Sequence, residues 1–343
     1  MVCRLDRFFA FTLTSVALVC GCRPGAVPEY VNDARVAELS PELQSDLNEQ
    51  LVNYAGDFVN PKLIAESDSP QPDLKHGQRV YQERCVQCHG VSGDGLGPAA
   101  TSMYPRPRDY RKGLFKFTST PYGSRPLRSD LLKTVREGVR GTSMPAFNLL
   151  PAQDLEAVVD YVIMLSRRGE LEEQLYLTAD SEEEIDPDYV QEDMVDFVIE
   201  RWAEAEGSEV RPLTLPPKFT SDHVARGRLA FLSKGCSKCH GEDGRGQTAD
   251  NRGNDAWGFP TRAADLTSGM LHGGTRPQDI YLRIFNGING TPMPGFSNSL
   301  KDEPDTIWDL VSYVLHVSGS RRRGESPAPG LMKPYVPEVT SVE

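Results

Sequence analysis

The sequence predicts an all-α protein in which two copies of one helical unit follow each other along the chain. A Cys-x-x-Cys-His motif occurs at residues 85–89 and again at 236–240. A Gly-x-x-Gly-Thr-x-Met-Pro-x-Phe segment follows each copy, at 138–147 and 287–296, and the histidine precedes the methionine by 55 residues in the first copy and 53 in the second. Around these motifs apolar residues recur at helical spacing, without the alternation typical of strands.

The composition is that of a soluble globular protein, with 38% hydrophobic and 25% charged residues. One strongly apolar run, residues 8–19, follows two arginines and is too short to span a bilayer as a helix, but it suits an export signal. Residues 1–22 resemble a bacterial lipoprotein signal, with Cys22, which follows a glycine, as the lipidated residue. Ordinary export without a lipid is the alternative.

Residues 23–72 are expected to form a stalk that contains one amphipathic helix. Ser40 is the predicted N-cap, Pro41 the first helical residue and Gly56 the end of the helix. Three leucines at a spacing of four residues line one face: Leu43, Leu47 and Leu51.

The repeated units are predicted at 73–168 and 220–319, each with three main helices. Asp73 is expected to cap the first helix of the first unit, and Ser221 or Asp222 the first helix of the second. The middle helices are expected to end near two glycines, and each closing helix carries one apolar stripe. The predicted ends are Gly138 and Gly287.

The segment between the units, residues 169–219, is predicted to be an acidic linker with one helix that starts at Asp186 and Pro187. From Arg167 to Asp222 the chain has 17 acidic and 5 basic residues, a net charge of −12, which equals the formal charge of the whole chain. The tail, residues 320–343, is expected to be disordered.

Cys-x-x-Cys-His is the attachment motif of haem c, because two cysteines at this spacing can form thioether bonds to the two vinyl groups while the next histidine reaches the iron. The expected cofactors are therefore two covalent c haems. They would be bound through Cys85, Cys88 and His89, and through Cys236, Cys239 and His240. A zinc site would need further ligands near each pair, and a thioredoxin-like pair would need a βαβ unit.

With these motifs, each unit resembles a class I cytochrome c domain, and the resemblance covers about 180 of the 343 residues. It implies that Met144 and Met293, each followed by proline, are the second axial ligands; Met270 and His272 are the alternatives for the second haem. Thioether ligation raises the reduction potential of a haem. The resemblance also implies that the Pro98 carbonyl accepts a hydrogen bond from His89, an acceptor that the second unit lacks.

Further positions carry over from the same resemblance. The first and last helices of each unit are expected to cross, at Gly77 with Tyr81 and Tyr161, and at Gly227 with Phe231 and Tyr313. Four side chains are candidates for binding haem propionates, with a solvated surface role as the alternative: Arg106, Arg108, Trp257 and Arg262.

The function expected from two six-coordinate haems is electron transfer between respiratory-chain partners by a membrane-tethered carrier on the periplasmic side. The expected partners are redox proteins, such as a respiratory complex, an oxidase or a dehydrogenase, and the membrane itself, but not nucleic acid. Two alternatives stay open. One is a di-haem redox enzyme of the peroxidase or thiosulfate-oxidising type, and the other is a fixed cytochrome subunit of an oxidase or dehydrogenase complex.

Overall fold

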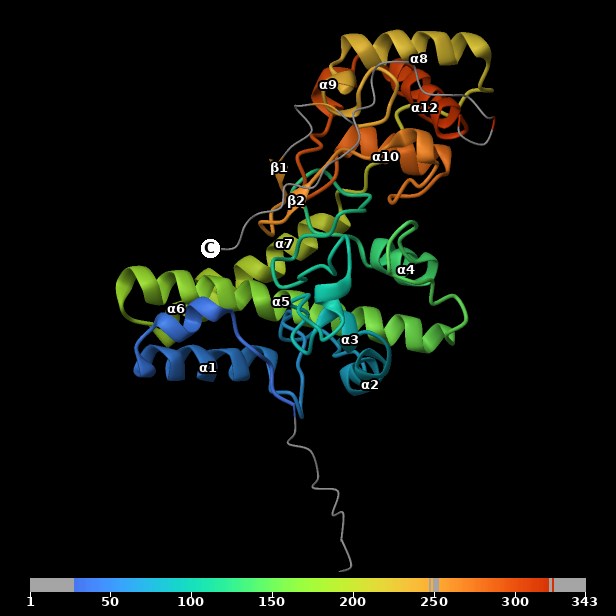
Figure 1. Ribbon diagram of the computed structural model, residues 1–343. Coiled ribbons are helices and arrows are strands. Elements are labelled where there is room, and N and C mark those ends of the chain that lie inside the picture. The colour runs from blue at the N-terminus through green and yellow to red at the C-terminus, as the bar shows by residue number, and fades with distance from the viewer. Residues whose placement is uncertain (1–27, 247, 249–252, 321–322, 324–343) are drawn as a thin grey trace, which may run out of the picture.

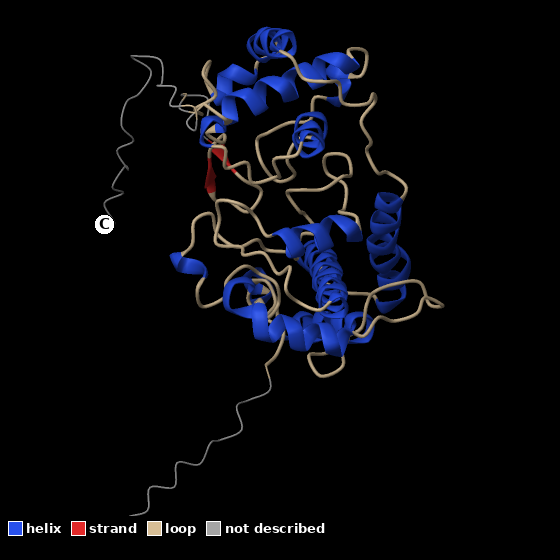
Figure 2. Cartoon of the chain, turned by 90° about the vertical axis from the view of Figure 1, so that its right-hand side faces the viewer, coloured by secondary structure: helices blue, strands red, loops and turns tan. Residues whose placement is uncertain are grey.

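Two helical bodies make up the molecule, and irregular loops lie between them, as Figure 1 and the turned view of Figure 2 show. This computed structural model describes residues 28–246, 248, 253–320 and 323. The first body ends with the helix at Asp196–Glu206, and the second begins with the helix at Ser221–Ser233. The predicted export signal with Cys22 lies outside the described residues, as do all but two residues of the predicted tail.

The N-terminal part of the first body is an amphipathic helix with a short turn before it. The 3-10 turn η1 (Ala34–Glu38) leads into α1 (Pro41–Ala55). As predicted, the Ser40 hydroxyl caps α1 by accepting a hydrogen bond from a backbone N–H, and Gly56 ends the helix with a φ of +72°. The apolar face of α1 is buried in the largest hydrophobic core of the molecule.

The first repeated unit contains the three predicted helices. They are α2 (Leu74–Arg84), α4 (Arg128–Glu137) and α5 (Ala152–Glu182), with the short turns α3 (Val86–His89) and η2 (Ala100–Ser102) between α2 and α4. Asp73 caps α2, because its Oδ1 accepts a hydrogen bond of 3.0 Å from the N–H of His76. Gly138, with a φ of +66°, ends α4 at the predicted position.

The second repeated unit has the same helix order. Its helices are α8 (Ser221–Ser233), α9 (Cys236–His240), α10 (Pro277–Asn286), α11 (Ser297–Leu300) and α12 (Pro304–Ser318), with the turn η5 (Leu266–Ser268) before α10. A two-residue antiparallel pair, β1 (Gly253–Asn254) and β2 (Pro260–Thr261), lies in the loop after α9. The cap of α8 is Thr220, not Ser221 or Asp222 as predicted, because the helix begins one residue earlier than expected.

The first and last helices of each unit cross at a glycine, as predicted. Gly77 lies against the carbonyl oxygen of Ala157, and Gly227 against that of Asp309, so a Cβ atom at either glycine would collide with backbone. An aromatic pair packs beside each crossing, with ring centroids 5.3 Å apart for Tyr81 and Tyr161 and 5.1 Å apart for Phe231 and Tyr313. Each Cys-x-x-Cys-His segment thus follows the first helix of an equivalent crossed pair, α2 with α5 or α8 with α12.

The closing helix of the first unit is longer than predicted, because α5 continues 14 residues past residue 168 to Glu182. Leu171, Leu175 and Ala179 continue its apolar stripe at a spacing of four residues and are buried against α1 and the following helices. Residues 169–182 are therefore part of a helix and not a linker, and the segment predicted to be a stalk packs on that helix.

The rest of the predicted linker folds back on α5. It contains α6 (Pro187–Tyr189), the π-helical turn η3 (Val190–Val195) and α7 (Asp196–Glu206), as Figure 1 shows. Asp186 caps α6 as predicted. Trp202 of α7 is buried, and its indole N–H donates a hydrogen bond of 2.8 Å to Glu170 of α5. Glu170 also forms a buried ion pair with Arg125, so a loop before α4, helix α5 and helix α7 share one carboxylate.

The described part of the chain contains no helix that combines the length and the apolar character needed to cross a bilayer.

Candidate functional site

Each Cys-x-x-Cys-His motif folds as a short helical turn directly after the first helix of its unit. In α3 the backbone N–H of His89 donates to the carbonyl of Cys85, 2.9 Å away, and Gly90 then ends the turn with a φ of +74°. Cysteines at positions i and i+3 and a histidine at i+4 lie on one face of such a turn. The fold therefore presents both thiols and the imidazole on the same side in α3, and α9 repeats this arrangement.

Both motif histidines are oriented by a backbone carbonyl. Nδ1 of His89 lies 3.3 Å from the carbonyl oxygen of Arg108, and Nδ1 of His240 lies 3.1 Å from that of Ala264. A carbonyl can only accept, so Nδ1 carries the proton and Nε2 is the nitrogen that can bind iron. Burial lowers the pKa of His89 to about 4 and lowers the pKa of His240, which keeps both imidazoles neutral.

The acceptor for His89 differs from the one that the sequence predicted. The Arg108 carbonyl occupies the place that the resemblance gave to Pro98. Arg108 and Ala264 are equivalent residues. Each lies two residues before a residue whose backbone N–H donates a 2.7 Å hydrogen bond to the glycine four positions after the motif histidine. These bonds run from Tyr110 to Gly93 and from Leu266 to Gly244. The predicted asymmetry in histidine orientation is therefore absent, since both units use the same position.

The first thiol of each motif is not activated for disulfide chemistry. Burial raises the pKa of Cys85 to about 12 and that of Cys236 to about 11, with a smaller contribution from the second cysteine of each motif. A redox-active pair has a thiol whose pKa is lowered. Among the described residues, no three His, Cys, Asp or Glu side chains gather where they could hold one metal ion. Neither the dithiol nor the zinc interpretation gains support, whereas thiols and a neutral imidazole suit haem attachment.

The two methionine loops have the same backbone structure. Matching hydrogen bonds close each loop. The carbonyl of Met144 accepts from the N–H of Val139, and that of Met293 from the N–H of Ile288, both at 3.1 Å. The threonine hydroxyls accept from the methionine N–H groups, Thr142 from Met144 at 3.1 Å and Thr291 from Met293 at 3.2 Å. The threonine of the Gly-Thr-x-Met-Pro segment thus fixes the backbone at the methionine. Met144 and Met293 are both partly buried. A soft thioether sulfur is the donor expected opposite a haem histidine.

The alternative ligands of the second unit lie at the domain interface. A Cβ atom at Gly141, in the first methionine loop, would lie 3.2 Å from Cε of Met270 and 3.3 Å from Nε2 of His272. Burial lowers the pKa of His272, and the nearby Lys116 lowers it further. Met270 and His272 therefore contact the first domain at the loop of Met144.

The candidate propionate ligands Arg106, Arg108 and Trp257 make protein contacts at the same interface. The Arg108 guanidinium pairs with Asp255 at 2.7 Å and lies over the ring of Trp257. The Trp257 indole N–H donates to the carbonyl of Asp109 at 3.1 Å. Arg106 lies over the ring of Phe259, 5.3 Å from its centroid.

One structural element beside the site was not predicted from the sequence. The loop Thr118–Arg125 of the first unit reaches the methionine loop of the second, where it contacts Asn289 and Thr291. Its signal in the sequence is a difference in length. The turn residue Tyr110 precedes Leu127, the N-cap of α4, by 17 residues, whereas its counterpart Leu266 precedes Arg276, the N-cap of α10, by only ten.

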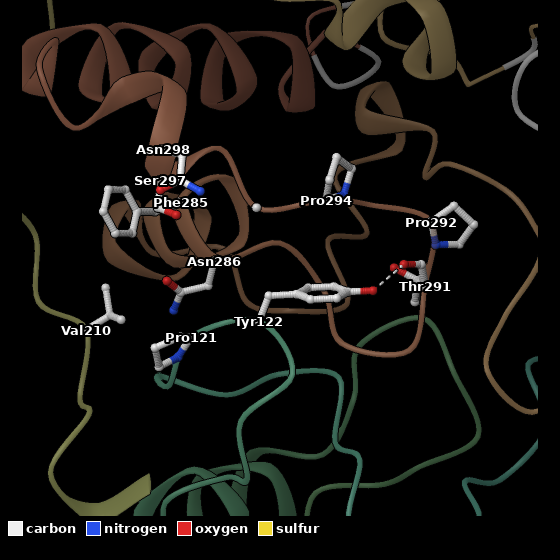
Figure 3. Close-up of a pocket in the computed structure, with 11 residues that line it drawn as sticks. Pro121, Tyr122, Val210, Phe285, Asn286, Thr291, Pro292, Pro294, Ser297 and Asn298 are labelled. Atoms are coloured by element: carbon white, nitrogen blue, oxygen red, sulfur yellow. Dashed lines mark hydrogen bonds between the residues drawn. The ribbon is translucent and has the colours of Figure 1, made fainter. Parts of the chain in front are cut away.

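A cavity of about 610 Å³ lies between this loop and the back of the second methionine loop (Figure 3). Its lining comes from three parts of the chain: Pro121 and Tyr122, then Val210, and then residues 285–298 of the second unit. No motif cysteine or histidine lines it, so this cavity is distinct from the side of each motif turn on which the thiols and the imidazole lie.

The two units match two described families. Residues 72–162 match the family described as cytochrome c oxidase, cbb3-type, subunit III, and residues 224–318 match the family described as cytochrome c. Among curated proteins, the cbb3-type cytochrome c oxidase subunit CcoP of Azospirillum sp. strain B510 is 22% identical over 258 residues. That match covers 71% of this chain and 62% of the relative, so this chain spans less than two thirds of that protein.

A solved structure is also similar. A chain of the reducing HAO-like protein complex of Kuenenia stuttgartiensis aligns with a TM-score of 0.56 and 31% sequence identity, and the alignment covers 71% of this chain and 96% of that chain.

Proposed function

Since this chain belongs to the di-haem c-type cytochromes, with one cytochrome c domain in each repeated unit, we propose that it carries electrons between redox proteins and has no substrate chemistry of its own. Cys85 and Cys88 would attach the first haem, and Cys236 and Cys239 the second. When bound, each haem supplies one-electron redox chemistry at its iron.

The observation that carries this proposal is the match between the two sets of iron ligands. In both domains a neutral imidazole is oriented by a backbone carbonyl at an equivalent position, and a methionine loop is closed by equivalent hydrogen bonds. His89 with Met144, and His240 with Met293, would make both irons six-coordinate. An enzyme of the peroxidase type requires one iron with an exchangeable position, and neither domain departs from the common pattern in the way that such a site would require.

The proposed setting is outside the cytoplasm, on the periplasmic side, because haem c is attached there in bacteria. A lipid at Cys22 would tether the protein to a membrane, close to respiratory partners. Mass spectrometry of the mature N-terminus tests the tether, since it supports the proposal only if a diacylated Cys22 is found.

Carbon monoxide binding to the reduced protein tests the electron-carrier proposal. We expect little or no rapid binding, because both irons are coordinatively saturated, and two one-electron steps in a potentiometric titration. Rapid binding of one carbon monoxide per protein would instead favour a redox enzyme.

A second candidate is a fixed cytochrome subunit of an oxidase-type complex. The observation that favours it is the match of residues 72–162 to the cbb3-type subunit III family. The chemistry at the haems would be the same, and the difference would lie in assembly. Purification from native membranes under mild detergent distinguishes the two, because a fixed subunit would co-elute with an oxidase at constant stoichiometry through several columns.

A further inference from the structure

The first domain contains a loop that has no counterpart in the second domain. From Tyr110 to the start of α4 the first domain has seven more residues than the second has from Leu266 to the start of α10. The additional residues fall in Thr118–Arg125, which we call the bridging loop. Because the second domain forms the same fold without it, the loop is not needed to build a cytochrome c domain.

The bridging loop is rigidly held by its own domain. The backbone N–H and hydroxyl of Ser119 both donate to Asp130 of α4, at 2.8 and 3.1 Å, and the hydroxyl of Thr120 donates to the carbonyl of Arg125 at 2.8 Å. Arg125 is paired with Glu170 of α5, and both side chains are buried. This loop is therefore an ordered part of the first domain that can impose its position on whatever it contacts.

Its contact surface is the methionine loop of the second domain. The N–H of Gly123 donates to Oδ1 of Asn289 at 2.8 Å, and the amide of Asn289 approaches the Thr118 hydroxyl at 3.4 Å. The hydroxyl of Tyr122 donates to the carbonyl of Thr291 at 3.2 Å, as Figure 3 shows. Asn289 is only 3% exposed. Losing a partner would leave this buried amide unsatisfied, so the contact is worth more than a surface hydrogen bond.

These contacts lie next to Met293. The same Thr291 whose carbonyl binds Tyr122 also accepts, through its hydroxyl, the backbone N–H of Met293. In addition, the ring of Trp257 packs against Gly290, and Trp257 is itself bound to the first domain through Asp109. Residues 289–291 therefore contact both the bridging loop and Trp257, and Trp257 is itself hydrogen-bonded to the first domain.

The equivalent loop of the first domain is contacted differently. Arg140 is an exposed residue of the Met144 loop, and its guanidinium reaches the hydroxyl of Thr275 in the second domain at 3.4 Å. A long exposed side chain imposes little order on a backbone. Met270 and His272 of the second domain also lie against Gly141 of this loop. The Met293 loop is instead hydrogen-bonded to the other domain through the buried Asn289 and the backbone carbonyl of Thr291. We therefore expect the dependence on the other domain to be stronger for Met293 than for Met144.

We propose that the bridging loop is a positioning element for Met293, so that the second haem keeps its methionine ligand only while the first domain is docked. This inference rests on the proposed role of Met293 as an iron ligand. It makes the potential of the second haem, and the access of small ligands to its iron, a property of the two-domain arrangement and not of the second domain alone.

The test changes the first domain only. In the full-length holoprotein, the double variant Thr118→Val with Tyr122→Phe keeps the shape of both side chains and removes their hydroxyls, while the second domain keeps its sequence. Tyr189→Phe removes another tyrosine hydroxyl, on α6, and serves as the matched control. Met144→Ala and Met293→Ala identify which potentiometric step belongs to which haem.

We expect the double variant to lower the potential of the second haem and to weaken the near-infrared band of methionine-ligated ferric haem. Carbon monoxide should bind the reduced second haem about tenfold faster, since a buried hydrogen bond is worth about that factor in an equilibrium constant. Asn289→Ala should do the same from the other side of the interface. The first haem and the Tyr189→Phe control should not change.

Two outcomes separate the inference from the proposed function. If Met293→Ala alters the second haem but neither the double variant nor Asn289→Ala does, the bridging loop has no positioning role and the inference is overturned. If Met293→Ala itself leaves the second haem unchanged, the ligand assignment of the proposed function is wrong. Equal shifts at both haems in the double variant would also overturn the inference, because both removed hydroxyls contact the methionine loop of the second domain.

Discussion

The guanidinium of Arg108 lies over the ring of Trp257, 4.5 Å from its centroid, while the carbonyl of the same Arg108 accepts the hydrogen bond from Nδ1 of His89. One residue of the first domain therefore connects the proposed iron ligand of its own haem to a side chain of the second domain. Asp255, whose side chain is 3% exposed, pairs with the same guanidinium at 2.7 Å. The residue that orients His89 through its backbone carbonyl is thus also held through its side chain, by Trp257 and Asp255 of the second domain.

Replacing Trp257 should loosen the two domains from each other. Trp257→Ala removes the cation–π contact, the hydrogen bond to Asp109 and the packing on Gly290. We expect a loss of about 2 kcal/mol in the free energy of unfolding, from the lost ring burial and the cation–π contact together. Urea unfolding followed by haem absorbance measures it, and Trp257→Phe should cost less because it keeps a ring beside Arg108. An unchanged transition in Trp257→Ala would contradict the role of this contact.

Replacing either methionine should affect one haem only. Met144→Ala and Met293→Ala each remove one thioether, so the potential of one haem should fall and one carbon monoxide should bind per reduced protein. Attachment should persist in both variants, because the cysteines are untouched. Potentiometric titration and carbon monoxide titration measure the two effects.

Met164→Leu is the control for these methionine variants. Met164 is 1% exposed in the core of the first domain, so a leucine there changes packing but no iron ligand. A potential shift in Met164→Leu as large as that in Met144→Ala would show that the change reflects altered packing rather than loss of a ligand.

The features predicted correctly from the sequence are those with local signatures. The caps at Ser40 and Asp73 and the helix ends at Gly56 and Gly138 depend on residues close together in the sequence. The glycine crossings were expected from the resemblance to cytochrome c domains, and the structure contains both. The continuation of α5 past residue 168 was not predicted, because Leu171 and Leu175 lie in a glutamate-rich segment that was interpreted as a linker. The structure explains why that segment is helical, since Glu170 and Glu172 are buried in ion pairs.

Two parts of the candidate site could not be predicted from the sequence alone. The acceptor for His89 is a backbone carbonyl in a loop, and any residue could supply it. The bridging loop could not be recognised from the histidine-to-methionine distances, because these are almost equal in the two domains. The first domain has more residues between Tyr110 and its methionine, whereas the second has more residues between its histidine and Leu266, and the two differences nearly cancel. Only the three-dimensional equivalence of the two loops shows where the additional residues lie.

The folded protein should become more stable as the pH rises above about 8. Burial lowers the pKa of Lys116 from 10.5 to about 8; nearby Arg108 adds to this, whereas Asp255, 3.8 Å away, opposes it. Between these pH values the unfolded chain holds a proton that the folded protein has lost, so the free energy of unfolding increases with pH. The full effect is about 3 kcal/mol, reached near pH 10.5.

Lys116→Met should abolish this dependence, because it removes the titrating amine and keeps a side chain of similar length. Urea unfolding from pH 7.5 to 10.5 on both proteins measures it, with the difference between them as the readout, since other groups titrate equally in each. A wild-type curve that runs parallel to that of Lys116→Met would show that the pKa of Lys116 is not lowered in the folded protein.

The glycine crossings should tolerate no side chain. At Gly77 a Cβ atom would overlap the carbonyl of Ala157, and at Gly227 that of Asp309, and in both cases the obstacle is backbone of a packed helix that cannot rotate away. Gly77→Ala and Gly227→Ala should therefore each destabilise one domain by about 3 kcal/mol, at the upper end of the cost of overpacking. Gly207→Ala is the control, because the nearest atom to its Cβ would be 4.0 Å away.

Differential scanning calorimetry, with absorbance at the haem bands, assigns each loss to a domain. Because each motif turn follows directly on the crossing helix, Gly77→Ala should lower the temperature at which the environment of the first haem changes and leave that of the second nearly unchanged. The reverse should hold for Gly227→Ala. If both variants unfolded like Gly207→Ala, the helices would have room to separate, and the close crossing would not be what fixes the motif turns in place.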